Sequence, residues 1–330
     1  MDWNNRSTLV IGGAGFCGAH LCQQLLNLGA SVAVLDKELP SDSYLVRAEL
    51  STRVHFLHGD ILDFPALRSL LERFEFDTIF HLAAQPIVSI SNAQPLETAH
   101  ANIIGTYNIL EAIRTVQSLN RSTPSLVFAS SGAYYGATQT TQAISEDAPA
   151  LVAGNIYAPT KAASDLAVRC YAKIYDLPAA TCRWMNTYGP GDTNFTRIVP
   201  ATIRRLLNGE RALIDGTDGS NILEVLHVRD MIAGYLKVAE KIQDENVRGE
   251  AFNFGGGTPM TLKDLVVAII AAWNAETGED RTEIPLITGP KIDSVKYLDI
   301  SKASRVLDWQ PQIDLQIGLR ETIRWYRKTA

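Results

Sequence analysis

The chain has 330 residues, of which 46% are hydrophobic and 20% charged, and its formal net charge is -6. This mildly acidic balance excludes a general electrostatic attraction to nucleic acid or to anionic membrane surfaces. The length allows one large domain or two smaller ones, either with a full hydrophobic core.

No apolar run approaches the length of a membrane-spanning helix, and the first residues lack the apolar core of a secretion signal. We therefore expect a cytoplasmic protein with no membrane partner and no nucleic-acid partner. The cysteines form no CxxC pair, and with six scattered histidines they form no recognisable metal site. Buried, reduced thiols are expected for Cys17, Cys22, Cys170 and Cys182.

The first predicted elements are a strand and a helix joined by a glycine-rich turn. The apolar run 9–11 indicates a buried strand, and apolar residues from Ala19 onward have helical spacing. Gly12, Gly15 and Gly18 lie between the two. Glycines there allow close backbone approach, and a helix N-terminus presents unpaired N–H groups to phosphates. The turn therefore predicts a dinucleotide-binding site, although a glycine-rich turn can also serve only to connect two packed elements.

A second strand, residues 31–36, ends in a carboxylate that favours the dinucleotide interpretation. Asp36 lies 18 residues beyond Gly18, where a carboxylate can accept hydrogen bonds from an adenosine ribose. The same charge would repel a 2′-phosphate. Asp36 therefore predicts NAD rather than NADP as the cofactor.

Further strand-like runs alternate with helical patterns, which predicts an α/β fold with a doubly wound parallel sheet of the Rossmann type. A ligand of such a sheet binds at the carboxyl ends of the strands. The additional predicted strands are 54–57, 78–82, 125–129 and 179–183.

After Arg183 the pattern changes to segments punctuated by proline and glycine, followed by helical patterns at 229–242, 262–273 and 315–326. We predict a smaller, discontinuous C-terminal substrate domain. Residues 1–185 and about 225–257 would form the NAD-binding domain, with the second stretch returning to the first sheet. Residues of about 186–224 and 258–330 would form this second, substrate-binding domain, packed against the first with a cleft between them.

Tyr157 is the one tyrosine followed four residues later by a lysine, Lys161. On a helix this spacing places both side chains on one face, and a nearby ammonium favours the phenolate. Pro159 is compatible with a helix if it lies in the first turn, so we expect the helix to start here. Ser131 follows the strand 125–129 and would offer its hydroxyl to the same cleft. A chance match and a serine-rich capping turn are the structural alternatives.

Together these features resemble the extended short-chain dehydrogenase/reductase family, in its branch of nucleotide-sugar epimerases and dehydratases. The resemblance covers nearly the whole chain. Other segments that carry it are Gly59-Asp60-Ile61, residues 81–85, Asn102 with Gly105-Thr106, residues 183–190, 299–303 and 307–311.

The resemblance implies a catalytic group of Ser131, Tyr157 and Lys161, in which Tyr157 takes the proton of a sugar hydroxyl while NAD takes the hydride. It implies that Lys161 holds the nicotinamide ribose and that Asn186 contacts the diphosphate of the sugar nucleotide. The cofactor-binding residues would be Gly12, Gly15, Phe16, Cys17, Gly18, Asp36, Asp60, Ile61, Leu82, Ala83, Ala84, Asn102, Tyr157 and Lys161. The substrate-binding residues would be Gln85, Ser131, Gly132, Ala133, Asn186 and Arg197.

Gly132 and Ala133 favour a nucleotide-sugar 4-epimerase. Dehydratases of the branch need a further acid and base, and the dTDP-glucose enzymes carry an Asp-Glu pair where this chain has Gly132-Ala133. Residues 81–85 and 194–200 instead resemble CDP-glucose 4,6-dehydratases. That activity is the alternative, and it would need a carboxylate from Glu146, Asp147 or Asp192. A non-catalytic NAD-binding sensor or scaffold is a third possibility, which the retained tyrosine and lysine disfavour.

One position departs from the pattern of the family. Its members commonly have Arg-Asp where this chain has Leu223-Glu224, and that arginine contacts the diphosphate. Arg197, Arg204 or Arg205 is a candidate replacement. The resemblance also implies a homodimer, formed by the helix after residues 81–85 and the helix that carries Tyr157; apolar residues on these helices could equally be core. They are Ile109, Leu110, Ile113, Leu166, Val168 and Tyr171.

Overall fold

The computed structural model describes residues 2–329 except 120, 139 and 293, and its centre is a seven-stranded parallel sheet. The strand order β11-β6-β5-β4-β1-β2-β3 reverses direction at β1, as in a doubly wound sheet. This confirms the predicted fold class. The strands are β1 (Ser7–Ile11), β2 (Ser31–Asp36), β3 (His55–His58), β4 (Thr78–His81), β5 (Ser125–Ala129), β6 (Ala179–Trp184) and β11 (Ala251–Phe254).

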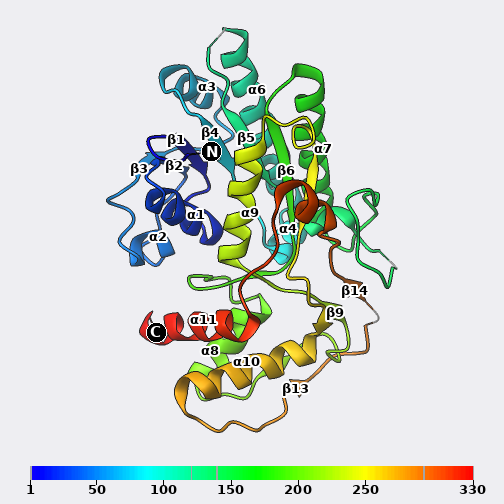
Figure 1. The fold of residues 1–330 in the computed structure, drawn as a ribbon. Helices are drawn as coiled ribbons and strands as arrows, with labels where there is room; N and C mark the ends of the chain where they lie inside the picture. Colours follow the sequence, from blue (N-terminus) through cyan, green and yellow to red (C-terminus); the bar gives the residue numbers. More distant parts are fainter. Residues whose placement is uncertain (1, 120, 139, 293, 330) are drawn as a thin grey trace.

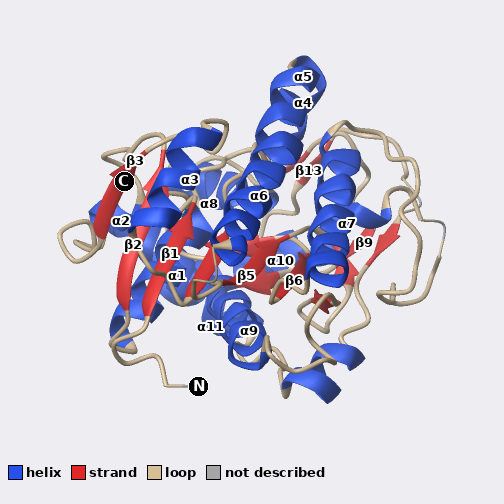
Figure 2. Ribbon diagram, turned by 90° about the horizontal axis from the view of Figure 1, so that it is seen from above, coloured by secondary structure: helices blue, strands red, loops and turns tan. Residues whose placement is uncertain are grey.

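Helices cover both faces of this sheet (Figures 1 and 2). The helical elements up to the last sheet strand are α1 (Phe16–Asn27), α2 (Tyr44–Arg47), α3 (Phe64–Arg73), α4 (Val88–Ala93), α5 (Pro95–Ala99), the π-helical turn η1 (His100–Ile104), α6 (Gly105–Ser118), the 3-10 turn η2 (Gly132–Tyr135), α7 (Tyr157–Tyr175), α8 (Ile198–Leu207) and α9 (Val228–Lys241). The later ones are α10 (Leu262–Thr277), the π-helical turn η3 (Ala303–Leu307) and α11 (Leu315–Thr329).

The side-chain alternation of the strands divides the core between the two faces. Leu9 and Ile11 of β1 belong to a buried cluster with α3, α6 and α7, whereas Val10 belongs to a second cluster with α1 and α9. Because both faces are buried, the strands are apolar throughout rather than alternating with polar residues.

A third buried cluster lies below the sheet in Figure 1 and joins α8, α10 and α11, which we call the helical lobe. In the described part of the chain, short strands form three small sheets outside the main one: β7 (Thr187–Tyr188), β8 (Leu213–Ile214), β9 (Ile222–Leu223), β10 (Leu226–His227), β12 (Met260–Thr261), β13 (Leu286–Ile287) and β14 (Val295–Lys296). β11 pairs with β6 at the edge of the main sheet. The division into two domains at the residues given above stays a prediction.

Helix α7 begins at Tyr157, with Pro159 in its first turn, as the sequence predicts. The Asn155 side chain accepts a hydrogen bond from the Ala158 N–H at 3.0 Å, which satisfies one of the unpaired donors at this helix start. Within the described residues, no helix is both long enough and apolar enough to cross a membrane.

Candidate active site

The glycine turn between β1 and α1 leaves no room for side chains. Gly12 has φ of +86°, and a Cβ there would lie 2.5 Å from the Ala83 nitrogen. A Cβ on Gly18 would overlap the Gly12 carbonyl oxygen. Helix α1 starts after Gly15 with no side-chain cap and no acidic residue in its first turn, so its N–H groups are available to an anion. Phe16 and Cys17 form the start of this helix.

Asp36 lies at the carboxyl end of β2, beside the glycine turn. Its carboxylate accepts hydrogen bonds from the Ala14 and Lys37 N–H groups at 3.0 and 2.8 Å. Burial raises the pKa of Asp36, and these two N–H groups oppose that shift. The turn and Asp36 together fit the pyrophosphate and the adenosine ribose of a dinucleotide.

Asp60 and Ile61 follow β3, the strand that pairs with β2 at the edge of the sheet. Asp60 forms an ion pair with Lys37 at 2.8 Å and accepts the Leu62 N–H at 3.0 Å. Ile61 is buried, and its side chain fills the space beside Gly105, where a Cβ would not fit. These residues therefore lie along the same edge of the sheet as the glycine turn.

The segment after β4 is fixed by its backbone. The Leu82 and Ala83 N–H groups both donate to the Ile11 carbonyl, at 2.8 and 2.9 Å, and Ala84 continues the segment to Gln85. The Gln85 side chain forms hydrogen bonds near its own loop: its amide donates to the Ile87 carbonyl and to the Thr98 hydroxyl.

Asn102 holds this segment against α7. Its amide oxygen accepts the Gln85 N–H at 2.7 Å, and its amide nitrogen donates to the Gln85 carbonyl at 3.1 Å and to the Thr160 hydroxyl at 2.9 Å. The residue is buried and lies in the π-helical turn η1. The sequence motif did not reveal this positioning contact, because Thr160 is 58 residues away in the chain.

Ser131 and Tyr157 meet at the carboxyl end of β5. The Ser131 hydroxyl accepts the Ala133 N–H at 3.1 Å, and it lies close enough to the phenol of Tyr157 to lower the pKa of that phenol. Burial raises the pKa of Tyr157, while Ser131 and the Arg197 guanidinium lower it. Cys17 of α1 also lies within electrostatic range of the phenol, and burial raises the pKa of its thiol to about 12.

Lys161 is buried one helical turn from Tyr157. Its ammonium donates to the Ala129 carbonyl at 2.7 Å and lies over the Phe128 ring. Burial lowers the pKa of Lys161 to about 8, and the Asp165 carboxylate opposes that shift. The spacing of Tyr157 and Lys161 predicted that this ammonium lowers the pKa of the phenol, but the cation that lowers it here is Arg197, from the start of α8.

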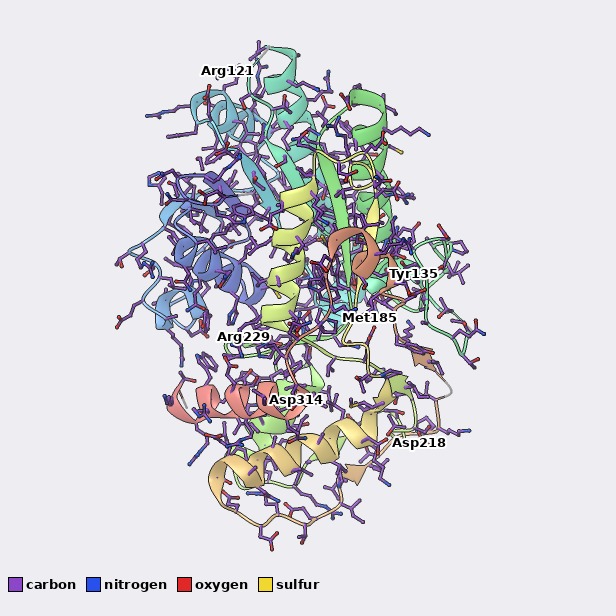
Figure 3. All side chains as sticks on the ribbon, viewed as in Figure 1. Arg121, Tyr135, Met185, Asp218, Arg229 and Asp314 are labelled. Atoms are coloured by element: carbon purple, nitrogen blue, oxygen red, sulfur yellow. The ribbon has the colours of Figure 1, made fainter. Side chains whose placement is uncertain are left out.

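Gly132 and Ala133 form the start of η2 beside the hydroxyl of Ser131. A Cβ on Gly132 would lie 2.6 Å from the sulfur of Met185, so Met185 fills the space that a longer side chain would need. Met185 lies at the junction of the sheet with the helical lobe (Figure 3).

Asn186 and Arg197, the remaining substrate-binding candidates, lie on the segment that leads from β6 to α8. Asn186 has φ of +34°, a left-handed conformation that asparagine tolerates, and its amide donates to the Glu224 carbonyl at 2.9 Å. Arg197 pairs with the buried carboxylate of Asp192 at 3.0 Å. Of the other two arginines considered for the diphosphate, Arg205 pairs with Glu210, and Arg204 lies over the Phe195 ring.

The three carboxylates considered for a dehydratase lie in different environments. Glu146 accepts the Asn253 N–H at 2.8 Å and is part of the packing between β11 and η2, and Asp147 is exposed. Asp192 shares a charged neighbour with Tyr157, because the Arg197 guanidinium lowers the pKa of both groups.

A buried polar network lies behind Lys161. Arg183 of β6 makes two hydrogen bonds to the Asp165 carboxylate, at 2.9 and 3.0 Å, and both side chains are fully buried. Ser130 donates to Asp165 at 2.6 Å, and Arg183 donates to the Tyr135 hydroxyl at 2.9 Å. Arg183 belongs to one of the motifs named above, but no spacing in the sequence links Asp165 of α7 to β6, so their pairing was not predicted.

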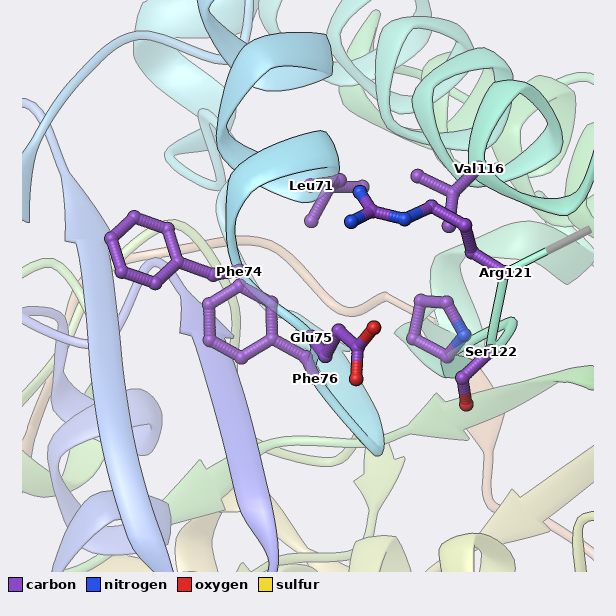
Figure 4. Close-up of a pocket in the computed structure, with 8 residues that line it drawn as sticks. Leu71, Phe74, Glu75, Phe76, Val116, Arg121 and Ser122 are labelled. Atoms are coloured by element: carbon purple, nitrogen blue, oxygen red, sulfur yellow. The ribbon is translucent and has the colours of Figure 1, made fainter. Parts of the chain in front are cut away.

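Two cavities lie away from the catalytic candidates. One of about 10 Å³, lined by Leu71, Phe76 and Arg121 among others, is too small for a substrate (Figure 4). The other, of about 360 Å³, lies where the sheet meets the helical lobe and is lined by residues such as Tyr188, His227 and Gln312.

Comparisons with known proteins match the chain as a whole. The family model described as GDP-mannose 4,6 dehydratase matches residues 9–322. This chain belongs to the GDP-mannose 4,6 dehydratase family. It is thus an enzyme of the nucleotide-sugar epimerase and dehydratase branch, which confirms the family predicted from the motifs.

Relatives of this chain include both reaction types. The UDP-glucose 4-epimerase of Mycolicibacterium smegmatis is 32% identical over 98% of this chain and 99% of its own length. The dTDP-glucose 4,6-dehydratase 1 of Escherichia coli is 30% identical over 96% of this chain and 92% of its own. Identity therefore does not separate the two activities.

Solved structures of epimerases and dehydratases superpose closely on this chain. The UDP-glucose 4-epimerase of Thermotoga maritima, determined with UDP-glucose, is 28% identical with a TM-score of 0.83, and the match covers 98% of this chain and 99% of that one. The dTDP-glucose 4,6-dehydratase of Bacillus anthracis, in complex with NAD, is 25% identical with a TM-score of 0.81, and covers 98% and 97%.

Proposed function

We propose that this chain is an NAD-dependent nucleotide-sugar 4-epimerase that acts through a transient 4-keto sugar. The observation that carries the proposal is the surface beside Ser131, where Gly132 and Ala133 have no group that can transfer a proton and Met185 fills the adjoining space. An epimerase needs the tyrosine but no second acid and base at this place. Support for NAD comes from the glycine turn and Asp36, and from the NAD complexes among the similar structures.

The residues of the chain have distinct roles in this proposal. When bound, NAD supplies the acceptor for the hydride of the sugar and returns it. Tyr157, in its phenolate form, accepts the proton of the sugar 4-hydroxyl on its phenolic oxygen and gives the proton back when the hydride returns, and Ser131 hydrogen-bonds the same sugar oxygen. Lys161, held by the Ala129 carbonyl, holds the cofactor ribose. Asn186 and Arg197 are the candidates for contact with the nucleotide sugar, whereas the Gln85 side chain is already hydrogen-bonded within its own loop.

A panel of UDP-, dTDP-, CDP- and GDP-sugars tests the activity. We expect conversion at C4 of one of them without loss of water, measured by NMR and mass spectrometry of the product. A 4-keto-6-deoxy product would instead support a dehydratase, for which Asp192 is the carboxylate that the geometry favours. NAD binding without turnover of any sugar would support a sensor.

Asp36→Ala tests the cofactor assignment. The substitution removes a charged acceptor for the ribose hydroxyls and the contact with the Ala14 N–H. We expect the affinity for NAD to fall by about 10–100-fold, because hydrogen bonds to a charged group contribute about 1.5–3 kcal/mol. The preference for NAD over NADP should fall with it. Fluorescence titration measures both affinities, and Asp42→Ala, at an exposed aspartate, is the control. An unchanged preference would contradict the role of Asp36.

The expected homodimer also belongs to this proposal, together with the expected cytoplasmic location. Ile109, Leu110, Ile113 and Val168 are buried within the chain, so they are core and leave no surface for a partner. Other apolar residues of the same helices are exposed. They are Ile104 of η1, Tyr107 of α6, and Leu166, Ile174 and Tyr175 of α7.

Leu166, Cys170 and Ile174 follow one another at four-residue spacing, so they form one exposed stripe along α7; the expected burial of the Cys170 thiol is wrong, because Cys170 lies on this outer face. A second copy of the chain would bury this stripe. We expect light scattering to give twice the mass of the chain for the wild type, and the mass of one chain for Leu166→Lys combined with Ile174→Lys. Val267→Lys with Ile317→Lys, at exposed apolar positions of the helical lobe, is the matched control. A monomeric wild type would contradict the dimer.

A further inference from the structure

The substrate expected under the proposed function carries a diphosphate, yet position 223 is a leucine where family members commonly have the arginine that contacts it. Leu223 ends the short strand β9 in a three-stranded sheet of order β12-β9-β14. Of the three arginines considered as replacements, Arg197 and Arg205 are already paired with carboxylates, and Arg204 lies over the Phe195 ring. A diphosphate bound here therefore needs a further cation.

The strand register places a lysine beside Leu223. Leu223 pairs with Lys296 of β14 in the parallel ladder, and with Met260 of β12 on its other side. Paired residues of neighbouring strands are about 5 Å apart and project from the same face of the sheet. Met260, Leu223 and Lys296 thus form one row, and the lysine extends from the position next to the missing arginine.

This row lies beside the candidate substrate residues. Leu223 and Met260 pack against the buried cluster of the helical lobe, which includes Val199 and Ile203 of α8, and Arg197 precedes α8. On the other side, the Glu224 carbonyl accepts the Asn186 amide at 2.9 Å. Figure 1 shows β9 and β14 next to each other where the sheet meets the helical lobe.

Lys296 is partly buried, and in the part of the chain that the structure describes its ammonium has no hydrogen-bond or ion-pair partner. Its surroundings lower its pKa through burial alone. The nearby carboxylate of Glu224 is occupied by the Leu298 and Gly257 N–H groups, at 2.7 and 3.1 Å. A partly buried ammonium without an anion is costly, and a phosphate group would satisfy it.

We propose that Lys296 binds the diphosphate of the nucleotide-sugar substrate, in the place that an arginine at position 223 holds elsewhere in the family. This inference rests on the proposed function. It assigns the cation to a strand 73 residues further along the chain, brought to the site by the pairing of β14 with β9.

Calorimetric titration with UDP, dTDP, CDP and GDP, and with the matching nucleosides, tests the assignment. For the diphosphate that the wild type binds most tightly, Lys296→Met should weaken binding by about 10–100-fold, the range for loss of a charge-assisted hydrogen bond. The affinity for the nucleoside should change less than about twofold, since nucleosides lack phosphate. Lys263→Met, at an exposed lysine of α10, is the matched control.

A second substitution makes the test specific to the ladder. Leu223→Arg added to Lys296→Met should restore most of the lost affinity, because the new guanidinium lies in the same row. Thermal melting establishes that each variant is folded, and Lys296→Gln replaces Lys296→Met if that variant does not fold.

Failure of the Lys296 assignment and failure of the proposed function would give different results. Unchanged diphosphate affinity in Lys296→Met, or an equal loss of nucleoside affinity, would overturn the role of Lys296 and leave the proposed function intact. If the wild type bound none of the four diphosphates, the proposed function itself would be contradicted, and the inference with it.

Discussion

Tyr157→Phe should leave NAD bound and lower turnover by about 10²–10⁴-fold, the range for loss of a general acid or base. The substitution removes one oxygen from a partly buried ring beside Ser131, and it leaves the Lys161 contact with the Ala129 carbonyl in place. Steady-state kinetics on the sugar identified by the panel measures the loss. Because the proton acceptor acts in the transition state, kcat should fall far more than KM rises.

Tyr175→Phe, near the other end of the same helix, is the matched control. Its ring is part of the exposed surface, so turnover should stay within about twofold of the wild type. Turnover of Tyr157→Phe close to the wild-type value would show that another group takes the proton. Loss of NAD binding in that variant would instead indicate a structural role for the phenol.

Asp165→Asn should lower the free energy of unfolding by about 3–5 kcal/mol, as expected when a buried ion pair loses one partner. Asp165 and Arg183 are both fully buried, and the substitution leaves the guanidinium without a counter-charge while it keeps nearly the same shape. Urea unfolding followed by circular dichroism measures the difference. The network joins α7 to β6, so the loss should weaken the packing on which Tyr157 and Lys161 depend.

Glu72→Gln is the control for a surface pair. Glu72 pairs with Arg68 at i, i+4 spacing on α3, where both groups are partly exposed, and such pairs contribute about 0–1 kcal/mol. An equally small effect of Asp165→Asn would mean that the neutral amide satisfies Arg183 as well as the carboxylate does.

The same variant has a pH signature. Burial lowers the pKa of Lys161, and the charge of Asp165 partly opposes that effect; together they bring the pKa of Lys161 to about 8. Without that charge the pKa falls further, so Lys161 loses its proton at a lower pH. If the charged lysine is needed for turnover, the alkaline limb of the pH profile should move to lower pH in Asp165→Asn. Glu72→Gln should leave the limb unchanged.

Local patterns in the sequence were sufficient for several parts of this protein. The apolar runs and the glycine spacing predicted β1, the turn and α1, because strand and helix periodicities are set by neighbouring residues. The spacing of Tyr157 and Lys161 predicted the start of α7 in the same way. Gly132 and Ala133, read directly from the chain, already favoured one reaction over the other.

Contacts between distant segments were decided only by the tertiary structure. The pairing of Asp165 with Arg183, the action of Arg197 on Tyr157, and the place of Lys296 beside Leu223 each join elements that no local spacing relates. Their geometry depends on how the helical lobe packs against the sheet and on the register of a two-residue strand. A periodicity records which face of an element is buried, but it does not record which side chain lies opposite.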